Sequence, residues 1–203
     1  YLYTGKKNLS ANILDSYPVL GMLIRINVFH DINNDNLKYY DDIYVDGKII
    51  VEPTKNQINQ FEKTYDVNGM VVMAGIIDIH SHMGVYPAPS VRTSSDGNEA
   101  TSPVTAEVWA EHSMWVQDPQ YALALKGGIT TFHVLPGSAN LIGGRGVTVK
   151  NLQRNTIQSM KYPDAKHSLK MACGENPKRV YGNRGQAPST RMGNFAGYRK
   201  AWI

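Results

Sequence analysis

The sequence predicts an α/β fold in which parallel strand–helix units follow a small β-sheet region, and three observations indicate this. Residues 1–70 contain short strands between turns, without an apolar stripe of helical period. From residue 70 onwards, near-continuous apolar runs predict strands that are buried on both faces. Helical segments separate these runs, which is the pattern of parallel βα units.

The first region carries strand and hairpin signals. Residues 19–29 form an apolar, β-branched run, and the polar residues 31–42, rich in Asn and Asp, predict a long surface loop. Residues 42–51 alternate into and out of a tight turn at Asp46-Gly47, which predicts a β-hairpin. About seventy residues bury too little apolar surface for more than marginal stability alone. We therefore expect this region to pack beside the domain that follows.

The second region opens with a strongly apolar strand. Residues 70–80 predict this buried strand, and residues 83–117 predict a long loop that carries one short helix. Asp118-Pro119 is a good helix start, with Asp as the N-cap and Pro at the first helical position. Residues 121–126 continue that helix, and Gly127-Gly128 ends it.

The rest of the chain continues the alternation of strands and helices. A second buried strand is expected over residues 129–135, and shorter strands over residues 147–150 and 168–173. A short helix is expected over residues 151–160, and another begins at residue 191.

Composition and charge exclude several classes of protein. The chain of 203 residues is 42% hydrophobic and 19% charged, which excludes a disordered tail, a collagen-like repeat and a heptad coil. The longest uncharged apolar run, residues 70–77, is too short for a membrane span. The 21 Lys and Arg residues exceed the 17 Asp and Glu residues by four, but they are scattered, so we expect no nucleic-acid partner.

Cysteine usage narrows the classes further. The single cysteine, Cys173, excludes an internal disulfide framework and a thiolate-rich zinc module. No base stands beside it in the sequence, so we expect a buried and inert thiol. The compartment stays open; a cytoplasmic location is the first expectation, and a secreted or organellar one is the alternative.

A His-x-His pair at the end of the first buried strand carries the strongest chemical signal. Alternate residues of a strand point to the same face, so Asp78, His80 and His82 line one side. The C-terminal ends of parallel strands are where α/β barrels place their active sites. Neutral imidazoles bind zinc and similar divalent ions, and carboxylates can complete the ligand set. A chance pair is the alternative, but the strand end and the loop after it favour a metal site.

The residues around this pair resemble a known family. Residues 74–82 are similar to the first-strand signature of the amidohydrolase superfamily, and residues 46–49 resemble the hairpin of the small β-domain that precedes its barrel. Further similarities point to the imidazolonepropionase-related branch, which includes prolidase-like enzymes. They lie at residues 127–132, 135–140, 143–146 and 170–179, so that the resemblance covers most of residues 42–200.

The resemblance implies the N-terminal part of a metal-dependent (β/α)₈ TIM-like barrel, preceded by a small β-sandwich-like subdomain. Residues 1–70 would form the subdomain, and residues 71–203 the first half of an incomplete barrel. A whole barrel needs about 250 residues. The family's remaining metal ligands are two histidines and an aspartate that acts as the general base, and they have no counterpart here. We therefore expect a partial chain, completed by the same polypeptide or by a second chain. We also expect a homo-oligomer.

The family places a third metal-binding or bridging group, a carboxylated lysine or a glutamate, at the end of the fourth barrel strand. This sequence offers both, because Lys170 lies within the predicted strand and Glu175 follows its end. A lysine ligates only when it is deprotonated and carboxylated in a buried niche. Glu175 needs no modification and is preferred. The alternatives are a snorkelling Lys170 and a Glu175 that pairs with Lys178 or Arg179.

Asn140 and Arg145 are candidate substrate-binding residues in a glycine-rich loop after the second buried strand. The glycines of this loop, Gly143, Gly144 and Gly146, let backbone N–H groups approach an oxyanion or carboxylate. Arg145 can add a bidentate contact to such a group. A tight structural loop at the barrel mouth is the alternative. The loop lacks the Lys-Ser/Thr of a phosphate-binding loop, so nucleotide binding is not expected.

The resemblance implies hydrolysis of amide C–N bonds, non-peptide or peptide-like, in a small-molecule substrate. One or two ions of zinc, or of another divalent metal, would lower the pKa of bound water and polarise the scissile carbonyl. No catalytic base is identified within this chain, so we expect these residues alone to be inactive. The alternative function is that of a catalytically inactive amidohydrolase-like subunit with a structural or assembly role.

Overall fold

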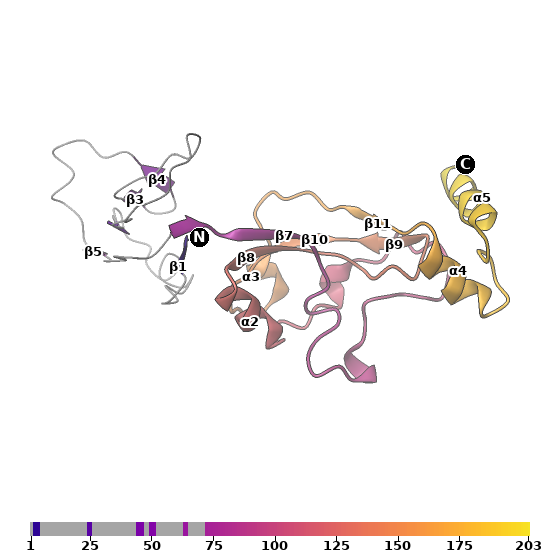
Figure 1. Ribbon diagram of the computed structural model, residues 1–203, viewed down its shortest axis with the longest axis horizontal. Helices are drawn as coiled ribbons and strands as arrows, with labels where there is room; N and C mark the ends of the chain where they lie inside the picture. Colours follow the sequence, from indigo (N-terminus) through magenta and orange to yellow (C-terminus); the bar gives the residue numbers. More distant parts are fainter. Residues whose placement is uncertain (1, 5–23, 26–43, 47–48, 52–62, 65–71) are drawn as a thin grey trace, which may run out of the picture. The chain divides into compact units, whose positions relative to one another are not determined.

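The chain divides between Gly75 and Ile76 into two units of a mixed α/β fold (Figure 1). The computed structural model describes residues 2–4, 24–25, 44–46, 49–51, 63–64 and 72–203. The surface loop expected over residues 31–42 lies outside these ranges.

In the first unit, Tyr1–Gly75, the described residues form three pairs of short strands. Strands β3 (Tyr44–Asp46) and β4 (Ile49–Val51) are antiparallel, with Tyr44 opposite Val51, which confirms the two strands of the expected hairpin. The other two pairs join elements that are distant in sequence. They are β1 (Leu2–Thr4) with β6 (Val72–Ala74), antiparallel, and β2 (Ile24–Arg25) with β5 (Lys63–Thr64), parallel.

The second unit, Ile76–Ile203, contains a sheet of three strands in the order β10-β8-β7. Strands β7 (Ile76–Ser81) and β8 (Ile129–Val134) are parallel and are connected through helix α2 (Gln120–Lys126), which is the predicted βαβ arrangement. Strand β10 (Val147–Lys150) occupies its predicted residues but runs antiparallel to β8. The segment between β8 and β10 contains no helix to carry the chain back for a parallel return.

A separate two-stranded sheet pairs β9 (Ile142–Arg145) with β11 (Leu169–Met171) in antiparallel fashion. The prediction of a glycine-rich loop after β8 is therefore wrong for this segment, which is a strand. A Cβ atom on Gly144 would lie 2.5 Å from the carbonyl oxygen of Val108, so the glycine allows two backbones to approach. Glycine in this strand marks close packing rather than a loop.

The core of the second unit lies around β8 and β10. Buried apolar side chains from these two strands pack with others from α2, α3 (Ile157–Met160) and the loop after β7. The main members are Val85, Tyr121, Phe132, Val134, Val149 and Met160.

Strand β7 is not buried on both faces, contrary to the prediction. Ile77 is 61% exposed and Ile79 is 76% exposed. The described residues therefore do not pack over these two side chains. Strand β7 is also an edge strand, because it pairs only with β8 among the described strands. The apolar run identified the strand but not its neighbours.

The long loop after β7 contains two short 3-10 helices, η1 (Arg92–Ser94) and η2 (Ala110–His112). The buried carboxylate of Asp118 holds the start of this loop, because it accepts hydrogen bonds from the backbone N–H groups of Gly84, at 3.0 Å, and Ala88, at 3.3 Å. It also accepts one from Gln120 N at 3.0 Å. Helix α2 thus begins one residue later than predicted, after Pro119.

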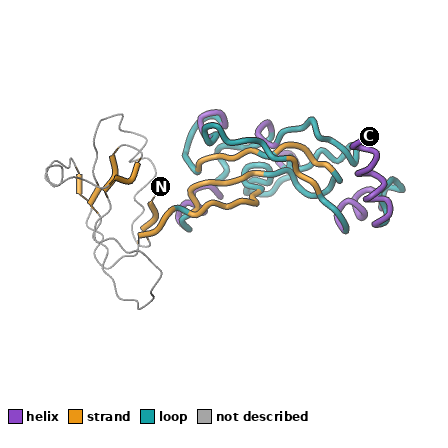
Figure 2. Tube along the Cα trace, turned by 90° about the horizontal axis from the view of Figure 1, so that it is seen from above, coloured by secondary structure: helices purple, strands orange, loops and turns teal. Residues whose placement is uncertain are grey.

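Helices α4 (Glu175–Gly182) and α5 (Arg191–Trp202) lie side by side near the C-terminus (Figure 2). Helix α5 begins where it was expected, and the Thr190 hydroxyl caps it by accepting from Gly193 N. Helix α3 is shorter than the expected helix over residues 151–160, and α4 was not predicted at all. Within the described residues, no helix is both long and apolar enough to cross a bilayer.

Candidate metal centre and the pocket beside it

Two imidazoles come together at the C-terminal end of β7. His80 lies in the strand and His82 directly follows it, and their ring centroids are 5.3 Å apart at an interplanar angle of 81°. The carboxylate of Asp78 accepts a hydrogen bond from the backbone N–H of His80 at 3.0 Å. Asp78 therefore braces the strand end that presents the two rings.

The ring of His82 is fixed by the neighbouring strand. Its Nδ1 lies 2.8 Å from the carbonyl oxygen of Leu135, the residue that follows β8. Because a carbonyl oxygen can only accept, Nδ1 carries a proton, and in the neutral form of this ring the lone pair lies on Nε2. This is the usual state of a metal-binding histidine, whose second nitrogen donates to a carbonyl or carboxylate.

Lys170, on β11, reaches the other imidazole. Its Nζ lies 3.1 Å from His80 Nε2, although the two residues are 90 positions apart in the sequence. Burial lowers the pKa of the Lys170 ammonium. The charge of Lys170, and then burial, lower the pKa of His80, so the uncharged imidazole is favoured. Glu175, the preferred candidate of the sequence, instead stands in the first turn of α4 with an exposed side chain.

The donor set fits part of a metal site. His82 offers Nε2, and His80 Nε2 faces the same small space as Lys170 Nζ. Two imidazoles are ligands that suit zinc. In the part of the chain that the structure describes, however, no three His, Cys, Asp or Glu side chains gather closely enough to hold a metal ion. These residues therefore supply two imidazole ligands and a lysine rather than a complete ligand set.

A pocket of about 250 Å³ opens beside His82. Its walls come from the loops after β7 and β8 and from α4, and most of its side chains are polar but uncharged. The polar side chains that line it belong to His82, Tyr86, Asn98, Ser138, Asn176 and Arg179. The last five of these residues were not predicted as site residues, because nothing in the sequence relates the loops after β7 and β8 to residues 175–182.

The two candidate substrate-binding residues have other contacts. Asn140 is only 1% exposed, and its Nδ2 lies 2.7 Å from both Glu99 O and Thr105 Oγ1. The guanidinium of Arg145 lies 4.6 Å from the ring centroid of Trp109. Neither residue lines the pocket beside His82. Asn140 therefore braces a loop, and Arg145 stacks on an indole.

A third imidazole, that of His133, lies on β8 and interacts electrostatically with His80. Its Nε2 is 2.7 Å from Ser168 Oγ and its Nδ1 is 2.9 Å from Thr148 Oγ1, so both ring nitrogens have hydroxyl partners. Burial, and then the nearby rings of His167 and His80, lower the pKa of His133. This half-buried, neutral imidazole links three strand segments.

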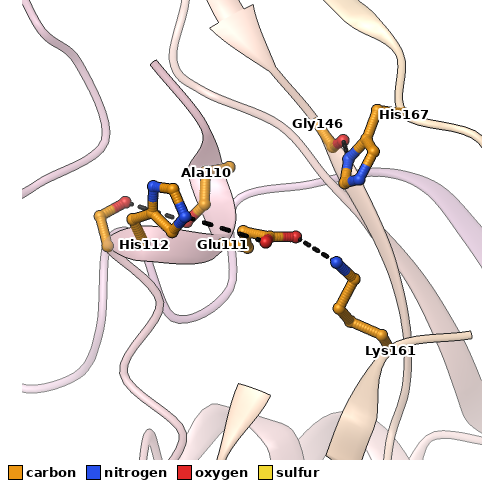
Figure 3. A network of polar contacts seen from close by, with 7 residues as sticks. Ala110, Glu111, His112, Gly146, Lys161 and His167 are labelled. Atoms are coloured by element: carbon orange, nitrogen blue, oxygen red, sulfur yellow. Dashed lines mark hydrogen bonds and ion pairs between the residues drawn. The ribbon is translucent and has the colours of Figure 1, made fainter. Parts of the chain in front are cut away.

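A further polar network lies around Glu111, in η2 (Figure 3). The carboxylate of Glu111 is 7% exposed and lies 2.8 Å from the ammonium of Lys161. Near the Glu111–Lys161 pair, His167 Nδ1 donates a hydrogen bond to the carbonyl oxygen of Gly146 at 2.8 Å. Burial alone would raise the pKa of Glu111, but the bond to Lys161 and its charge, together with the charge of His167, lower it.

The cysteine does not belong to either site. Cys173 is exposed, so the prediction of a buried thiol is wrong. It follows β11 at the point where the chain turns into α4 and leaves the sheet.

Comparisons with known proteins bear on the class to which this site belongs. No protein-family model matches the sequence. The chain is 37% identical over 147 residues, 68% of its length, to amidohydrolase tasK of Hapsidospora irregularis, of which it covers 15%. It is also similar to the crystal structure of an amidohydrolase from Thermotoga maritima MSB8. That match has a TM-score of 0.73 and 38% identity, and it covers 81% of this chain and 42% of the other.

The two similarities support a place for the chain in the amidohydrolase superfamily, in agreement with the resemblance seen in the sequence. The chain spans 15% of the length of the curated relative and 42% of the solved chain. The narrower assignment to the imidazolonepropionase-related, prolidase-like branch stays a prediction.

Proposed function

We propose that this chain is the N-terminal part of a metal-dependent hydrolase of amide C–N bonds in small, non-peptide or peptide-like substrates. The observation that supports it most is the convergence of His80, His82 and Lys170 at the end of β7, in a chain similar to amidohydrolases. A bound zinc, or another divalent ion, would supply a Lewis acid and an activated water.

The residues of this chain would hold the ion and orient it. His80 and His82 would bind through Nε2, and the bond from His82 Nδ1 to Leu135 O would keep the second ring from rotating. Lys170 would serve as a further ligand in the form of a carbamate, made when its amine nitrogen attacks CO₂ and loses a proton. Glu175 remains the alternative bridging ligand. The proposed site holds one or two ions.

The other half of a (β/α)₈ barrel, with the general base and the last ligands, would come from the same polypeptide or from a second chain. Residues 1–70 would form the β-sandwich-like subdomain and residues 71–203 the first half of the barrel. A homo-oligomer and a cytoplasmic location belong to the same proposal.

Metal content tests the proposal. The purified full-length protein should contain a stoichiometric divalent metal, measured by mass spectrometry, and should hydrolyse members of a dipeptide and cyclic-amide panel. Changing both His80→Ala and His82→Ala should remove the metal. His112→Ala is the matched control, because this mostly exposed imidazole stacks near Trp109 in another part of the unit. Metal that survives the double change would overturn the proposed site.

Two single substitutions test which residue is the third ligand. Lys170→Arg keeps a positive charge but removes the amine that forms a carbamate, so it should reduce bound metal if Lys170 is the bridging ligand. Unchanged metal in that variant, with loss in Glu175→Gln, would assign the role to Glu175.

Activity separates the enzyme from the alternative function. A full-length protein that binds metal but hydrolyses no amide would be the inactive subunit instead.

A further inference from the structure

We propose that Arg179 binds a carboxylate group of the substrate in the pocket beside His82. This inference rests on the proposed function. Together they define the substrates as small amides that carry a carboxylate, such as N-acylamino acids or dipeptides. The inference replaces Arg145 and Asn140 as the substrate-binding residues, because neither lines this pocket.

The fold places the two ends of such a substrate within one small space. His82 follows β7, and its Nδ1 is hydrogen-bonded to the carbonyl oxygen of Leu135, so that Nε2 is the ring nitrogen left for a ligand. Arg179 stands in α4 and lines the same pocket of about 250 Å³. That volume is roughly that of eight water molecules, each of which takes about 30 Å³ in the liquid. An amide of amino-acid size fits it.

The single positive charge of the pocket favours a ligand group that carries a single negative charge. Among the described residues that line it, Arg179 carries the one permanent charge, and there is no carboxylate. A guanidinium forms paired, parallel hydrogen bonds with a planar carboxylate. A phosphate dianion would leave one of its charges unmatched here. The pocket is therefore suited to a carboxylate rather than to a phosphate.

The neutral side chains around Arg179 are already positioned to donate. Asn176 Nδ2 donates to Ser138 Oγ at 2.6 Å, which leaves the Ser138 hydroxyl proton and the second Asn176 proton free to donate into the pocket. Asn98 Oδ1 accepts from Ala139 N at 2.9 Å, and one proton of its Nδ2 is given to the Tyr86 hydroxyl. Arg179 Nη2 lies 3.4 Å from Asn176 Oδ1, a loose contact that a substrate carboxylate can replace.

Binding measurements test this subsite apart from catalysis. Isothermal titration of the full-length, zinc-loaded protein should show that N-acetylglycine binds at least about tenfold more tightly than N-acetylglycinamide, as expected for a hydrogen bond to a charged group. Arg179→Ala should abolish this preference and Arg179→Lys should keep part of it. Arg199→Ala, a change of an exposed arginine on α5, should leave it intact.

Several outcomes would overturn the inference. These are equal binding of acid and amide, no binding of either, or a preference for the acid that survives Arg179→Ala. Inorganic phosphate that displaces N-acetylglycine more strongly than acetate does would identify a phosphate site instead. Hydrolysis of amides without preference for the acid would remove this subsite and leave the proposed function. Preferential binding of the acid without hydrolysis would keep the subsite and remove the enzyme.

Discussion

At the scale of the residue, Gly144 decides whether β9 can approach the loop that precedes it. Its φ of +110° lies in a region that other residues rarely adopt, and a Cβ would lie 2.5 Å from both Val108 Cγ2 and Val108 O. The neighbouring Arg145 N donates to Val108 O at 2.7 Å, so the two backbones are held together at this point. Conformation and space both require glycine here.

We expect Gly144→Ala to destabilise the protein by about 2–5 kcal/mol, because backbone strain and overpacking add. Gly185→Ala is the matched control, since Gly185 has a φ of +69° but nothing within 4 Å of a built Cβ. That control should lose only about 1–2 kcal/mol. Urea denaturation measures both free energies of unfolding. Equal losses would mean that the contact with Val108 contributes nothing.

At the scale of the element, two buried carboxylates hold the long loop over residues 83–117 against the sheet. Asp118 binds the backbone at the start of the loop, and Glu111, in η2, binds Lys161 near its end. The loop thus has a fixed course without long helices of its own. This matters for the site, because Tyr86 and Asn98 of the pocket belong to the same loop.

The Glu111–Lys161 pair predicts a pH dependence of stability. The folded pKa of Glu111 lies below its ordinary value of 4.5, so the pair stabilises the protein above that pH. The stabilisation is lost as pH falls through the folded pKa. Glu111→Gln should cost about 1–3 kcal/mol at pH 7, because the partly exposed Lys161 loses its partner. It should also flatten the decline in stability between about pH 5 and 3.

Thermal unfolding followed by circular dichroism at pH 7, 5 and 3.5 checks this expectation. Glu107→Gln, a change of an exposed carboxylate in the same loop, is the control and should keep the wild-type profile. An unchanged acid decline in Glu111→Gln would show that other groups govern it.

The elements that the sequence predicted well are those whose patterning is local. Apolar β-branched runs predicted β8 and β10, and Gly127-Gly128 marked the end of α2, where Gly127 is the C-cap. Strand β9 was missed because its glycines resemble a loop, although they serve close packing with Val108. Helix α4 was missed because residues 175–182 carry no clear apolar stripe of helical period; Pro177 lies in its first turn, where proline is tolerated.

In the site, too, proximity within one strand could be predicted from the sequence, and contacts between distant segments could not. His80 and His82 are two residues apart on one strand, so their proximity could be predicted. The contact between His80 and Lys170 came within reach only through the family resemblance, because the two residues are 90 positions apart and lie on strands of different sheets. Arg179 could not be found from the sequence, since its helix was itself missed.

At the scale of the whole molecule, the described unit has an apolar strand that the rest of it does not cover. Ile77 and Ile79 of β7 are mostly exposed, and the chain covers 42% of the Thermotoga chain that it resembles. Within the proposal, the downstream barrel strands would pair with β7 and complete the ligand set.

We therefore expect residues 1–203 alone to show no amide hydrolysis, even when zinc is supplied. The absence of a general base costs about 10²–10⁴ in rate, and an open site admits water to every charged intermediate. Adding the downstream polypeptide, in cis or as a separate chain, should restore turnover of a dipeptide and cyclic-amide panel. Turnover by the segment alone would contradict the account of a divided site.

The edge position of β7 also bears on how these 203 residues behave in concentrated solution. An outer edge without a partner among the described strands, next to exposed isoleucines, is a template on which strands of other molecules can add. Such growth is self-propagating, because each added strand presents a new edge of the same kind. Aggregation of the isolated segment should therefore begin at β7 and depend steeply on protein concentration, even where every other element of the fold is intact.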